Sequence, residues 1–521
     1  MWLPHLLQRN SSRDPHALAL RDPRRDVSWE EFARDVAALS AVLARRVPAT
    51  GRVLVLSANR VEMLETYFAC AAAGVVAVPV NPGLADPEIA YIEAAVQPCL
   101  AVADAAGRER LGGRPELPVL PIEEIGGLPD TAGLPDTAGE PDRASAITAP
   151  AAILHTSATT GRPKGVVVDQ RSFQLNALSW LADVGVPPGT AFLNPCPLFH
   201  GSMVIALDYL AAGATVCVLD RFTPTGCLSA LESWRIGHTF LVPSMVRMLL
   251  ESRALAGTDL GALRLVLHGA APMPADLALA ARTQLGAALQ TIFGITEGGG
   301  PVLSLQPTDK PGDPPVPGAV CVGLPMLGTQ ARVLAEHGAP AGIDEIGEIH
   351  LRGDGLMQGY WRDPEATAGA LRDGWLNTRD LGCVGQDGHL WVVDRRNDLI
   401  LRGGQNVYPA EIEHVLRGCR EVADVAVVPA PSMAWGQTPV AFVEAQPGAT
   451  VVEDELIELC VTQLASYKRP SRFVLIDRIP RNPAGKILRA GLRRQAAEQV
   501  AEQSAQQSAQ QAAEQSAEDN R

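Results

Sequence analysis

Four lysines stand out in a chain whose cations are otherwise arginine. Of 44 lysine and arginine residues, only these are lysine: Lys164, Lys310, Lys468 and Lys486. Lys164 and Lys486 each close a loop that contains glycine and proline. A mobile ammonium on a flexible stem can follow a phosphoryl group through a reaction better than a planar guanidinium can. We therefore interpret these two lysines as groups for phosphate chemistry. Chance and a bias toward arginine are the alternative, which we adopt for Lys310.

The loop before Lys164 is rich in hydroxyl groups. It follows a short apolar strand expected at residues 151–154 and reads Thr156-Ser157-Ala158-Thr159-Thr160-Gly161-Arg162-Pro163-Lys164-Gly165. Hydroxyls, backbone N–H groups and a cation at one turn can bind an anion. The spacing is not that of a Walker A loop, in which Gly-Lys-Ser/Thr opens a helix. We predict a phosphate-binding loop, with a plain polar turn as the alternative.

Seven segments together resemble the adenylate-forming superfamily, which comprises acyl-CoA synthetases, the adenylation domains of peptide synthetases and luciferases. They occur in the family's order along nearly the whole chain: residues 156–165, 197–201, 269–272, 293–297, 375–382, 394–413 and 482–487. Several are weak signals when taken alone. Their common order and spacing make the resemblance specific.

The resemblance implies which residues bind ATP and AMP. The hydroxyl-rich loop is similar to the loop that holds pyrophosphate, residues 269–272 to a turn that contacts adenine, and residues 375–382 to a ribose-binding element. Asp380 can accept hydrogen bonds from both ribose hydroxyls, and Arg395 can donate to the same sugar. The full implied set is Thr156, Ser157, Ala158, Thr159, Thr160, Gly161, Lys164, Gly269, Ala270, Ala271, Pro272, Phe293, Gly294, Thr296, Asp380, Arg395 and Lys486.

Four residues are predicted to be catalytic: three from this set, Lys164, Thr296 and Lys486, together with Glu297. When ATP activates a carboxylate, one anion attacks another, so the site must supply cations and hydrogen-bond donors. Thr296 can donate to the α-phosphate, and Glu297 can hold a Mg²⁺ that bridges phosphate oxygens. An ordinary surface glutamate is the alternative for Glu297. Lys164 would bind the leaving pyrophosphate, and Lys486 would bridge the carboxylate and the α-phosphate.

An acyl pocket is also implied by the resemblance. It would be formed by His200, Gly201, Val242 and Gly298. We favour His200 as a wall or gate of this pocket, without an acid–base role, over a core histidine. Three successive glycines at residues 298–300 lead us to expect room for a bulky substrate.

A thiol channel and a hinge complete the implied site. Gly403 and Gly404 would let the backbone pass close to the thiol arm of CoA. Lys468 and Arg469 could meet a CoA phosphate, or form a solvated surface pair. After adenylation Lys486 must leave, so we expect the small domain to swing about a hinge at Asn397.

Five positions depart from the family pattern. Ala158 stands where the loop usually has glycine, Gln170 replaces a common histidine, and Phe293 replaces tyrosine. Asn397 stands where lysine or aspartate is usual, which changes the electrostatics of the hinge. Arg379 replaces a frequent glycine before Asp380, a change that we expect to be harmless on an exposed turn.

Short β-rich runs alternate with longer Ala/Leu-rich runs, which favours parallel sheets covered by helices on both faces. Ser28 and Glu31 form a capping-box pattern before a helix at residues 28–42. A further helix is expected at residues 61–73. Strands are expected at residues 53–56, 75–80, 214–219, 238–242 and 263–268.

We predict an α/β fold with a large N-terminal domain at residues 1–396. It would consist of parallel-sheet αβ layers and a β-barrel-like subdomain. Residues 397–494 would form a small, mobile α+β domain. The last segment, residues 495–521, is an Ala/Gln/Glu tail of low complexity.

Composition limits the possible partners. The net charge of −14 argues against nucleic acid or an anionic membrane surface as a general partner. Nine cysteines without a CxxC pair indicate reduced thiols, as expected for the cytoplasm. No apolar run is long enough to cross a membrane, and the sequence does not predict an oligomeric state.

The leading hypothesis is an acyl-CoA synthetase that uses ATP, Mg²⁺ and CoA. Alternatives are a ligase that loads a carrier-protein phosphopantetheine, a ligand-binding homologue whose catalysis has decayed and, more remotely, a luciferase-like oxygenase. The presumed pocket is apolar, and no aspartate at residues 197–207 could pair with an α-ammonium. We therefore expect a fatty or aryl carboxylic acid as substrate.

Overall fold

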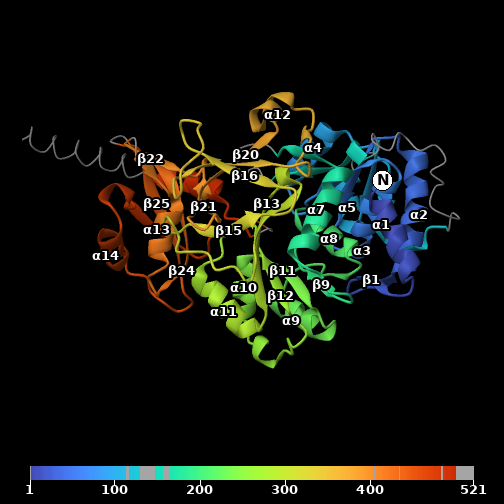
Figure 1. Ribbon diagram of the computed structural model, residues 1–521, viewed down its shortest axis with the longest axis horizontal. Coiled ribbons are helices and arrows are strands. Elements are labelled where there is room, and N and C mark those ends of the chain that lie inside the picture. Colours follow the sequence, from blue (N-terminus) through green and yellow to red (C-terminus); the bar gives the residue numbers. More distant parts are fainter. Residues whose placement is uncertain are drawn as a thin grey trace, which may run out of the picture.

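The computed structural model describes residues 2–112, 116–129, 147–156, 163–403, 405–432, 435–482 and 485–499. It consists of three β-sheets with helices packed around them (Figure 1). The N-terminal sheet and the C-terminal sheet lie at opposite ends of the molecule in this view. Within the described ranges, no helix has the length and apolar character needed to span a bilayer.

The N-terminal sheet has seven strands in the order β18-β8-β7-β4-β3-β5-β6. Its centre is parallel, and every residue of β4 and β5 is buried, which explains their continuous apolar sequences. The strands are β3 (Arg52–Leu56), β4 (Val76–Val80), β5 (Leu100–Ala103), β6 (Val119–Pro121), β7 (Pro150–His155), β8 (Gly165–Asp169) and β18 (Gly359–Tyr360).

The largest sheet has fourteen strands. Its parallel part consists of β10 (Thr215–Val218), β9 (Ala191–Asn194), β11 (His238–Leu241), β12 (Leu265–His268) and β13 (Ala288–Ile295). The other strands are β1 (Leu18–Arg21), β2 (Asp26–Ser28), β14 (Gly300–Leu305), β15 (Val320–Pro325), β16 (Gln330–Leu334), β17 (Gly347–Arg352), β19 (Leu371–Arg372), β20 (Trp375–Val384) and β21 (Leu390–Arg395).

Strands β14 to β17 and β19 to β21 differ from the sequence expectation in one respect. Where a barrel-like subdomain was expected, the described strands continue the large sheet in antiparallel pairs, in the order β16-β17-β20-β21-β15-β14. No closed barrel forms among them. The α/β class itself is confirmed.

The C-terminal sheet has five strands: β22 (Ile400–Arg402), β23 (Gln405–Val407), β24 (Val422–Ser432), β25 (Gly436–Ala445) and β26 (Arg472–Ile476). Helices α13 (Pro409–Leu416) and α14 (Glu453–Gln463) share an apolar core with this sheet. A final helical run covers residues 489–499. The proposed boundary between residues 396 and 397 stays a prediction.

Helices cover the two larger sheets. They are α1 (Trp2–Arg13), α2 (Trp29–Arg46), α3 (Val61–Ala72), α4 (Asp86–Val96), α5 (Ala105–Leu111), α7 (Gln170–Asp183), α8 (Ser202–Ala211), α9 (Pro224–Ser233), α10 (Pro243–Leu250), α11 (Ala275–Leu285) and α12 (Pro364–Ala370). Short 3₁₀ turns are η1 (Ile122–Gly127), η2 (Leu255–Gly257), η3 (Thr296–Gly298) and η4 (Ser466–Lys468). The expected capping box of Ser28 and Glu31 opens α2.

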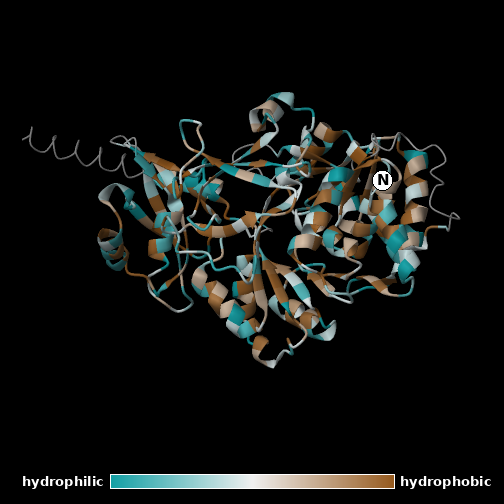
Figure 2. Ribbon diagram, viewed as in Figure 1, coloured by the Kyte–Doolittle hydropathy of each residue, from teal (hydrophilic) through white to brown (hydrophobic). Residues whose placement is uncertain are grey.

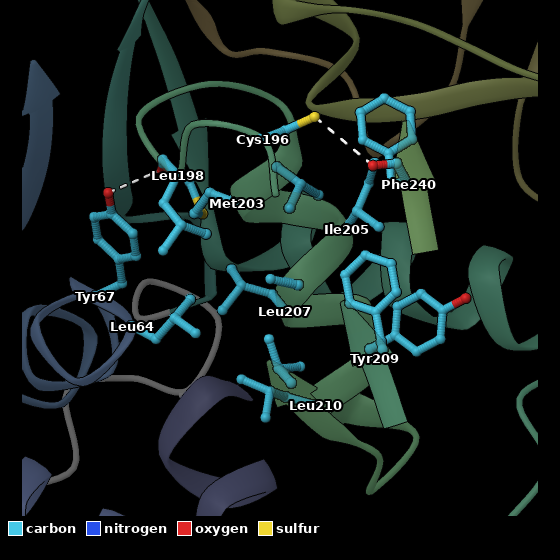
Figure 3. Packing of buried hydrophobic residues seen from close by; sticks show 14 of the residues in the cluster. Leu64, Tyr67, Cys196, Leu198, Met203, Ile205, Leu207, Tyr209, Leu210 and Phe240 are labelled. Atoms are coloured by element: carbon cyan, nitrogen blue, oxygen red, sulfur yellow. Dashed lines mark hydrogen bonds between the residues drawn. The ribbon is translucent and has the colours of Figure 1, made fainter. Parts of the chain in front are cut away.

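One apolar core extends from the N-terminal helices to the large sheet. The central strands are accordingly hydrophobic in Figure 2, whereas helices carry polar residues on their outer faces. Close to the expected acyl pocket, the hydroxyl of Tyr67 donates to the carbonyl of Leu198 at 3.1 Å (Figure 3). This buried contact fixes the start of residues 197–201 against α3.

Gln170 has a structural role at the position where a histidine is common in the family. Its side-chain oxygen accepts hydrogen bonds from the backbone N–H groups of Trp2 at 3.0 Å and Leu3 at 3.3 Å. Its amide group donates to the carbonyl of Ala71 at 3.4 Å. Gln170 therefore satisfies donors of the first turn of α1 and ties that helix to α3.

Candidate active site

The parallel strands of the large sheet bring several motifs to one edge. Strands β9, β11, β12 and β13 are neighbours, so their carboxyl ends lie along the same edge. Residues 197–201, Val242, residues 269–272 and η3 follow these four strands in that order. The predicted acyl-pocket and adenine segments therefore lie side by side, where open α/β sheets commonly bind ligands.

Two glycines allow close backbone packing at this edge. A Cβ on Gly269 would lie 2.3 Å from the carbonyl oxygen of Ile292, and one on Gly294 would lie 2.7 Å from that of Gly300. Ala270 follows with a φ of 64°, in the left-handed region. A side chain at Gly269 would push the expected adenine turn away from β13, and one at Gly294 would push β14 away from β13.

Asp380 and Arg395 form an ion pair across β20 and β21. They are register partners, and Arg395 Nε lies 3.0 Å from Asp380 Oδ1. The Asp380 side chain is 4% exposed, and its Oδ2 is buried without a hydrogen-bond partner among the described residues. Burial raises the pKa of Asp380, while Arg395 and Lys486 counteract this. A buried acceptor of this kind fits a ligand that supplies a hydroxyl group.

Lys486 lies close to this ion pair. Burial, and then repulsion from Arg395, lower the pKa of Lys486 to about 8, while Asp398 and Asp380 oppose the shift. Its backbone N–H donates to the side chain of Asn482 at 2.9 Å, which closes a turn.

That turn packs against the residues that follow β11 of the large sheet. A Cβ on Gly485 would lie 2.9 Å from Val242 and 3.1 Å from Ser244. The turn that carries Lys486 belongs to the C-terminal part of the chain and therefore contacts the expected acyl pocket.

Glu297 is linked to Lys164 through Tyr360. The Tyr360 hydroxyl donates to Glu297 Oε1 at 2.8 Å, and Lys164 Nζ lies 4.9 Å from the centroid of the Tyr360 ring. Glu297 is also one of the charges that raise the pKa of Asp380. The site therefore extends continuously from Lys486 through Asp380 and Glu297 to Lys164. Tyr360 is a residue that the sequence motifs did not indicate.

The hydroxyl-rich loop is described only at its base. Thr156 and Lys164 pair through Thr156 N to Lys164 O at 3.0 Å and Lys164 N to Thr156 Oγ1 at 3.2 Å. The assigned residues Ser157, Ala158, Thr159, Thr160 and Gly161 lie outside the described residues, as does Gly404. Lys164 is exposed and makes no ion pair with any described residue.

The acyl-pocket glycines are packed closely. A Cβ on Gly298 would lie 3.1 Å from Val302, one on Gly299 would lie 2.5 Å from the carbonyl oxygen of Gly355, and one on Gly300 would lie 2.7 Å from Asn176. These glycines therefore allow tight packing where room for a bulky substrate was expected.

His200 and Gly201 lie directly before α8, and Gly201 is the N-cap residue of this helix. The ring of His200 packs edge-on against Phe199, with centroids 4.7 Å apart. Burial lowers the pKa of His200 to about 4. A neutral imidazole at physiological pH fits the expectation of a pocket wall without an acid–base role.

The residues expected to bind CoA make structural contacts. Lys468 Nζ lies 2.6 Å from a carboxylate oxygen of Glu411, and Arg469 donates to the carbonyls of Leu464 and Val461 at 3.0 Å each. Gly403 has a φ of 59°, and its N–H donates to Trp435 O at 2.8 Å. At the hinge position, Arg493 donates to the carbonyl of Asn397 at 2.6 Å. Lys468 and Arg469 would have to exchange these partners to reach a phosphate.

Arg379 lies within β20 and not on the turn that was expected, and it is predicted to strain this strand. It is exposed, as expected, but its φ is 60°, where a non-glycine residue costs about 1–2 kcal/mol. Arg379→Gly should raise the stability by about 1 kcal/mol in thermal denaturation. Arg372→Gly is the control, because glycine in a strand without positive φ should destabilise the protein by about 0.5–1 kcal/mol. A lower melting temperature for Arg379→Gly would contradict the strain.

Comparison with known families gives the class of the protein. A family model described as AMP-binding enzyme matches residues 7–361, and one described as AMP-binding enzyme C-terminal domain matches residues 411–486. The chain therefore belongs to the AMP-binding enzyme family. It is an AMP-forming acid–thiol ligase.

Individual relatives match over nearly their whole length. The chain is 35% identical to feruloyl-CoA synthase from Amycolatopsis sp, covering 94% of this chain and 97% of the relative. It is 34% identical to the fatty acid–[acyl-carrier-protein] ligase ScoC from Streptomyces coeruleorubidus, covering 93% and 94%. The structure of o-succinylbenzoate CoA synthetase from Bacillus subtilis with its acyl-adenylate intermediate matches with a TM-score of 0.82 and 27% identity, covering 94% and 98%.

The donor set around Glu297 fits Mg²⁺. Among the described residues, nothing pairs with Glu297 Oε2, and the one cluster of three potential ligands, Cys419, Glu421 and Glu455, does not include Glu297. Mg²⁺ is usually held by one or two carboxylates together with substrate phosphates and water, not by an all-protein cage. A single carboxylate beside a phosphate site matches that preference.

Proposed function

We propose that the chain is an ATP-dependent acyl-CoA synthetase for a hydrophobic carboxylic acid, fatty or aryl. The half-buried position of Lys486 beside the Asp380–Arg395 pair, with its turn packed on Val242, is the observation that carries the proposal. It brings a cation to the junction of the acyl and nucleotide segments. The relatives include a feruloyl-CoA synthase, which supports an aryl acid.

In the first half-reaction a carboxylate oxygen would attack the α-phosphorus of ATP, and pyrophosphate would leave. Lys486 would hold the carboxylate and α-phosphate together, Thr296 would donate to the α-phosphate, and Lys164 would bind the leaving pyrophosphate. Mg²⁺ at Glu297 would neutralise charge on the phosphate oxygens. Asp380 and Arg395 would orient the ribose, and residues 269–272 with Phe293 would hold the adenine.

In the second half-reaction a thiol would attack the acyl carbonyl, and AMP would leave. Because Lys486 occupies the site in the described arrangement, we propose that rotation at Asn397 removes it and brings Gly403 and Gly404 to the thiol arm. We propose free CoA as the acceptor and the cytoplasm as the compartment, where the nine free cysteines would stay reduced.

A carrier-protein phosphopantetheine is the second candidate acceptor. The similarity to the ligase ScoC favours it, because that relative is named for an acyl-carrier-protein substrate. A homologue with decayed catalysis is the remaining alternative. It is disfavoured because Lys486, Asp380 and Glu297 meet at one site.

A panel of carboxylates tests the proposal. We expect carboxylate-dependent ATP–pyrophosphate exchange and thioester formation with free CoA for medium- or long-chain fatty acids or cinnamate-like acids, and weak activity with acetate and α-amino acids. Exchange without thioester formation would favour a carrier-protein acceptor. Absence of exchange with every acid would favour the decayed homologue.

A further inference from the structure

Tyr360 connects two parts of the site that come from different sheets. Its hydroxyl donates to Glu297 Oε1 at 2.8 Å, and its ring faces Lys164 Nζ at 4.9 Å. Glu297 belongs to η3, which lies between β13 and β14 of the large sheet. Lys164 directly precedes β8 of the N-terminal sheet. One side chain thus touches the proposed metal-binding carboxylate and the proposed pyrophosphate-binding lysine.

The position of Tyr360 is fixed by its backbone. Tyr360 is paired with Val166 across β18 and β8, and its N–H donates to Thr367 Oγ1 at 2.9 Å. The N–H of Trp361 donates to Gly165 O at 2.7 Å, directly beside Lys164. These bonds hold the ring against the base of the phosphate loop.

Glu297 is fixed from the same segment. The N–H of Met357, three residues before Tyr360, donates to Glu297 O at 3.0 Å. The main chain and the Tyr360 hydroxyl therefore hold Glu297 at two points. A carboxylate constrained in this way presents a defined oxygen to a ligand.

The hydroxyl of Tyr360 donates a hydrogen bond to one of the two carboxylate oxygens of Glu297, Oε1. Among the described residues, no hydrogen bond or ion pair reaches Glu297 Oε2, so Oε2 is the oxygen that would bind a metal. Mg²⁺ requires near-octahedral coordination with short bonds and few carboxylates, whereas Ca²⁺ accepts carboxylates that bind through both oxygens. A hydrogen bond that competes with two-oxygen binding favours Mg²⁺ over Ca²⁺.

We propose that Tyr360 is a positioning residue that makes Glu297 a single-oxygen metal ligand and keeps Lys164 beside the phosphate site. The inference rests on the proposed binding of ATP with Mg²⁺. The two functions of the side chain are separable, because the hydroxyl acts on Glu297 and the ring acts on Lys164. A cation over an exposed aromatic ring contributes about 0.5–1 kcal/mol.

The test measures ATP binding by calorimetry without carboxylate, in MgCl₂, in CaCl₂ and in EDTA. Tyr360→Phe should weaken ATP binding about tenfold in MgCl₂ and less than about threefold in CaCl₂ or EDTA, since a charged hydrogen bond is worth about 1.5–3 kcal/mol. The preference for Mg²⁺ over Ca²⁺ should therefore fall. Tyr360→Leu should in addition weaken binding in EDTA about threefold, because the ring beside Lys164 is lost.

Tyr209→Phe is the matched control. It also removes a hydroxyl hydrogen bond, 2.8 Å to His238 Nδ1, but in the buried core. We expect it to lower thermal stability and leave the ratio of Mg²⁺ to Ca²⁺ affinities unchanged. An equal change of that ratio in both variants would show a general structural effect and overturn the inference.

A double-mutant cycle tests whether Tyr360 acts through Glu297. In a Glu297→Gln background, Tyr360→Phe should change ATP binding in MgCl₂ by less than about twofold, because contacting residues are not additive. Another full tenfold loss would overturn the inference while leaving the proposed function intact. Failure of the unmodified protein to bind ATP under any condition would instead overturn the proposed function.

Discussion

Replacing Lys486 with alanine is expected to reduce carboxylate-dependent ATP–pyrophosphate exchange by about 10²–10³-fold, the usual effect of removing a group that stabilises transition-state charge. The physical reason is that in the proposed reaction two anions meet beside Asp380, where Lys486 is a half-buried cation. Thioester formation from supplied acyl-AMP and CoA should fall less than about tenfold, since we propose that Lys486 leaves before that step. Measuring the two half-reactions separately gives the result.

Lys310→Ala is the control for this variant, because Lys310 lies in the loop before β15 and outside the site. We expect its activity to equal that of the unmodified protein. Equal losses of both half-reactions in Lys486→Ala would contradict the role assigned to Lys486, because they would indicate a general structural effect.

The pH dependence of adenylation provides a second readout. Burial lowers the pKa of Lys486 to about 8, so its ammonium is present below that pH and is lost as the pH rises through it. Pyrophosphate exchange should therefore decline above about pH 8. Lys486→Arg keeps its charge at all these pH values and should lack this decline, even if its overall rate is lower.

The sequence predicted the elements of the fold well where the pattern was local. Buried strands such as β3 and β4 have continuous apolar runs, and the capping box of Ser28 and Glu31 lies within four residues of chain. The expected barrel-like subdomain is an open antiparallel extension of the large sheet, because the order of strands β14 to β17 and β19 to β21 depends on pairings between distant segments. No periodicity within one strand specifies its neighbour.

The residues of the candidate site differ in the same way: some lie in a local sequence motif, whereas others are placed only by contacts between distant segments. Lys486, Asp380 and Glu297 could be proposed because each lies in a distinctive motif. Tyr360 could not, because β18 has only two residues and its partners, Val166 and Glu297, are far away in sequence. Composition also did not show that side chains at residues 298–300 would meet neighbouring atoms, so room for a bulky substrate there stays a prediction.

Arg489, close to Lys486 in the sequence, links several segments of the C-terminal part of the chain. Its guanidinium lies 2.7 Å from Glu413 and 3.6 Å from Asp398, and it donates to the carbonyl of Val427 at 2.6 Å. Burial raises the pKa of Asp394 to about 7, and Arg489 is the main charge that opposes this rise. This largely enclosed guanidinium thus contacts the carboxylates of Asp398 and Glu413 and stabilises the charge of Asp394 electrostatically.

Arg489→Met is expected to destabilise the C-terminal part by about 3–5 kcal/mol, the usual cost of leaving buried charges without their partner. Amide hydrogen exchange of α13 and β24, followed by mass spectrometry at pH 8, measures this as faster exchange. Arg417→Met is the matched control. Arg417 also contacts Glu413, at 3.4 Å, but it is 31% exposed, so its loss should cost no more than about 1 kcal/mol.

The cost of Arg489→Met should depend on pH in a defined direction. In the folded protein the pKa of Asp394 is already raised above its usual value, so Asp394 stabilises the fold at low pH, and this contribution is lost as the pH rises through about 7. Removal of Arg489 raises that pKa further. The difference between variant and unmodified protein should therefore be largest at pH 8 and smaller at pH 6. A cost independent of pH would show that packing of the arginine stem, and not its charge, holds the cluster together.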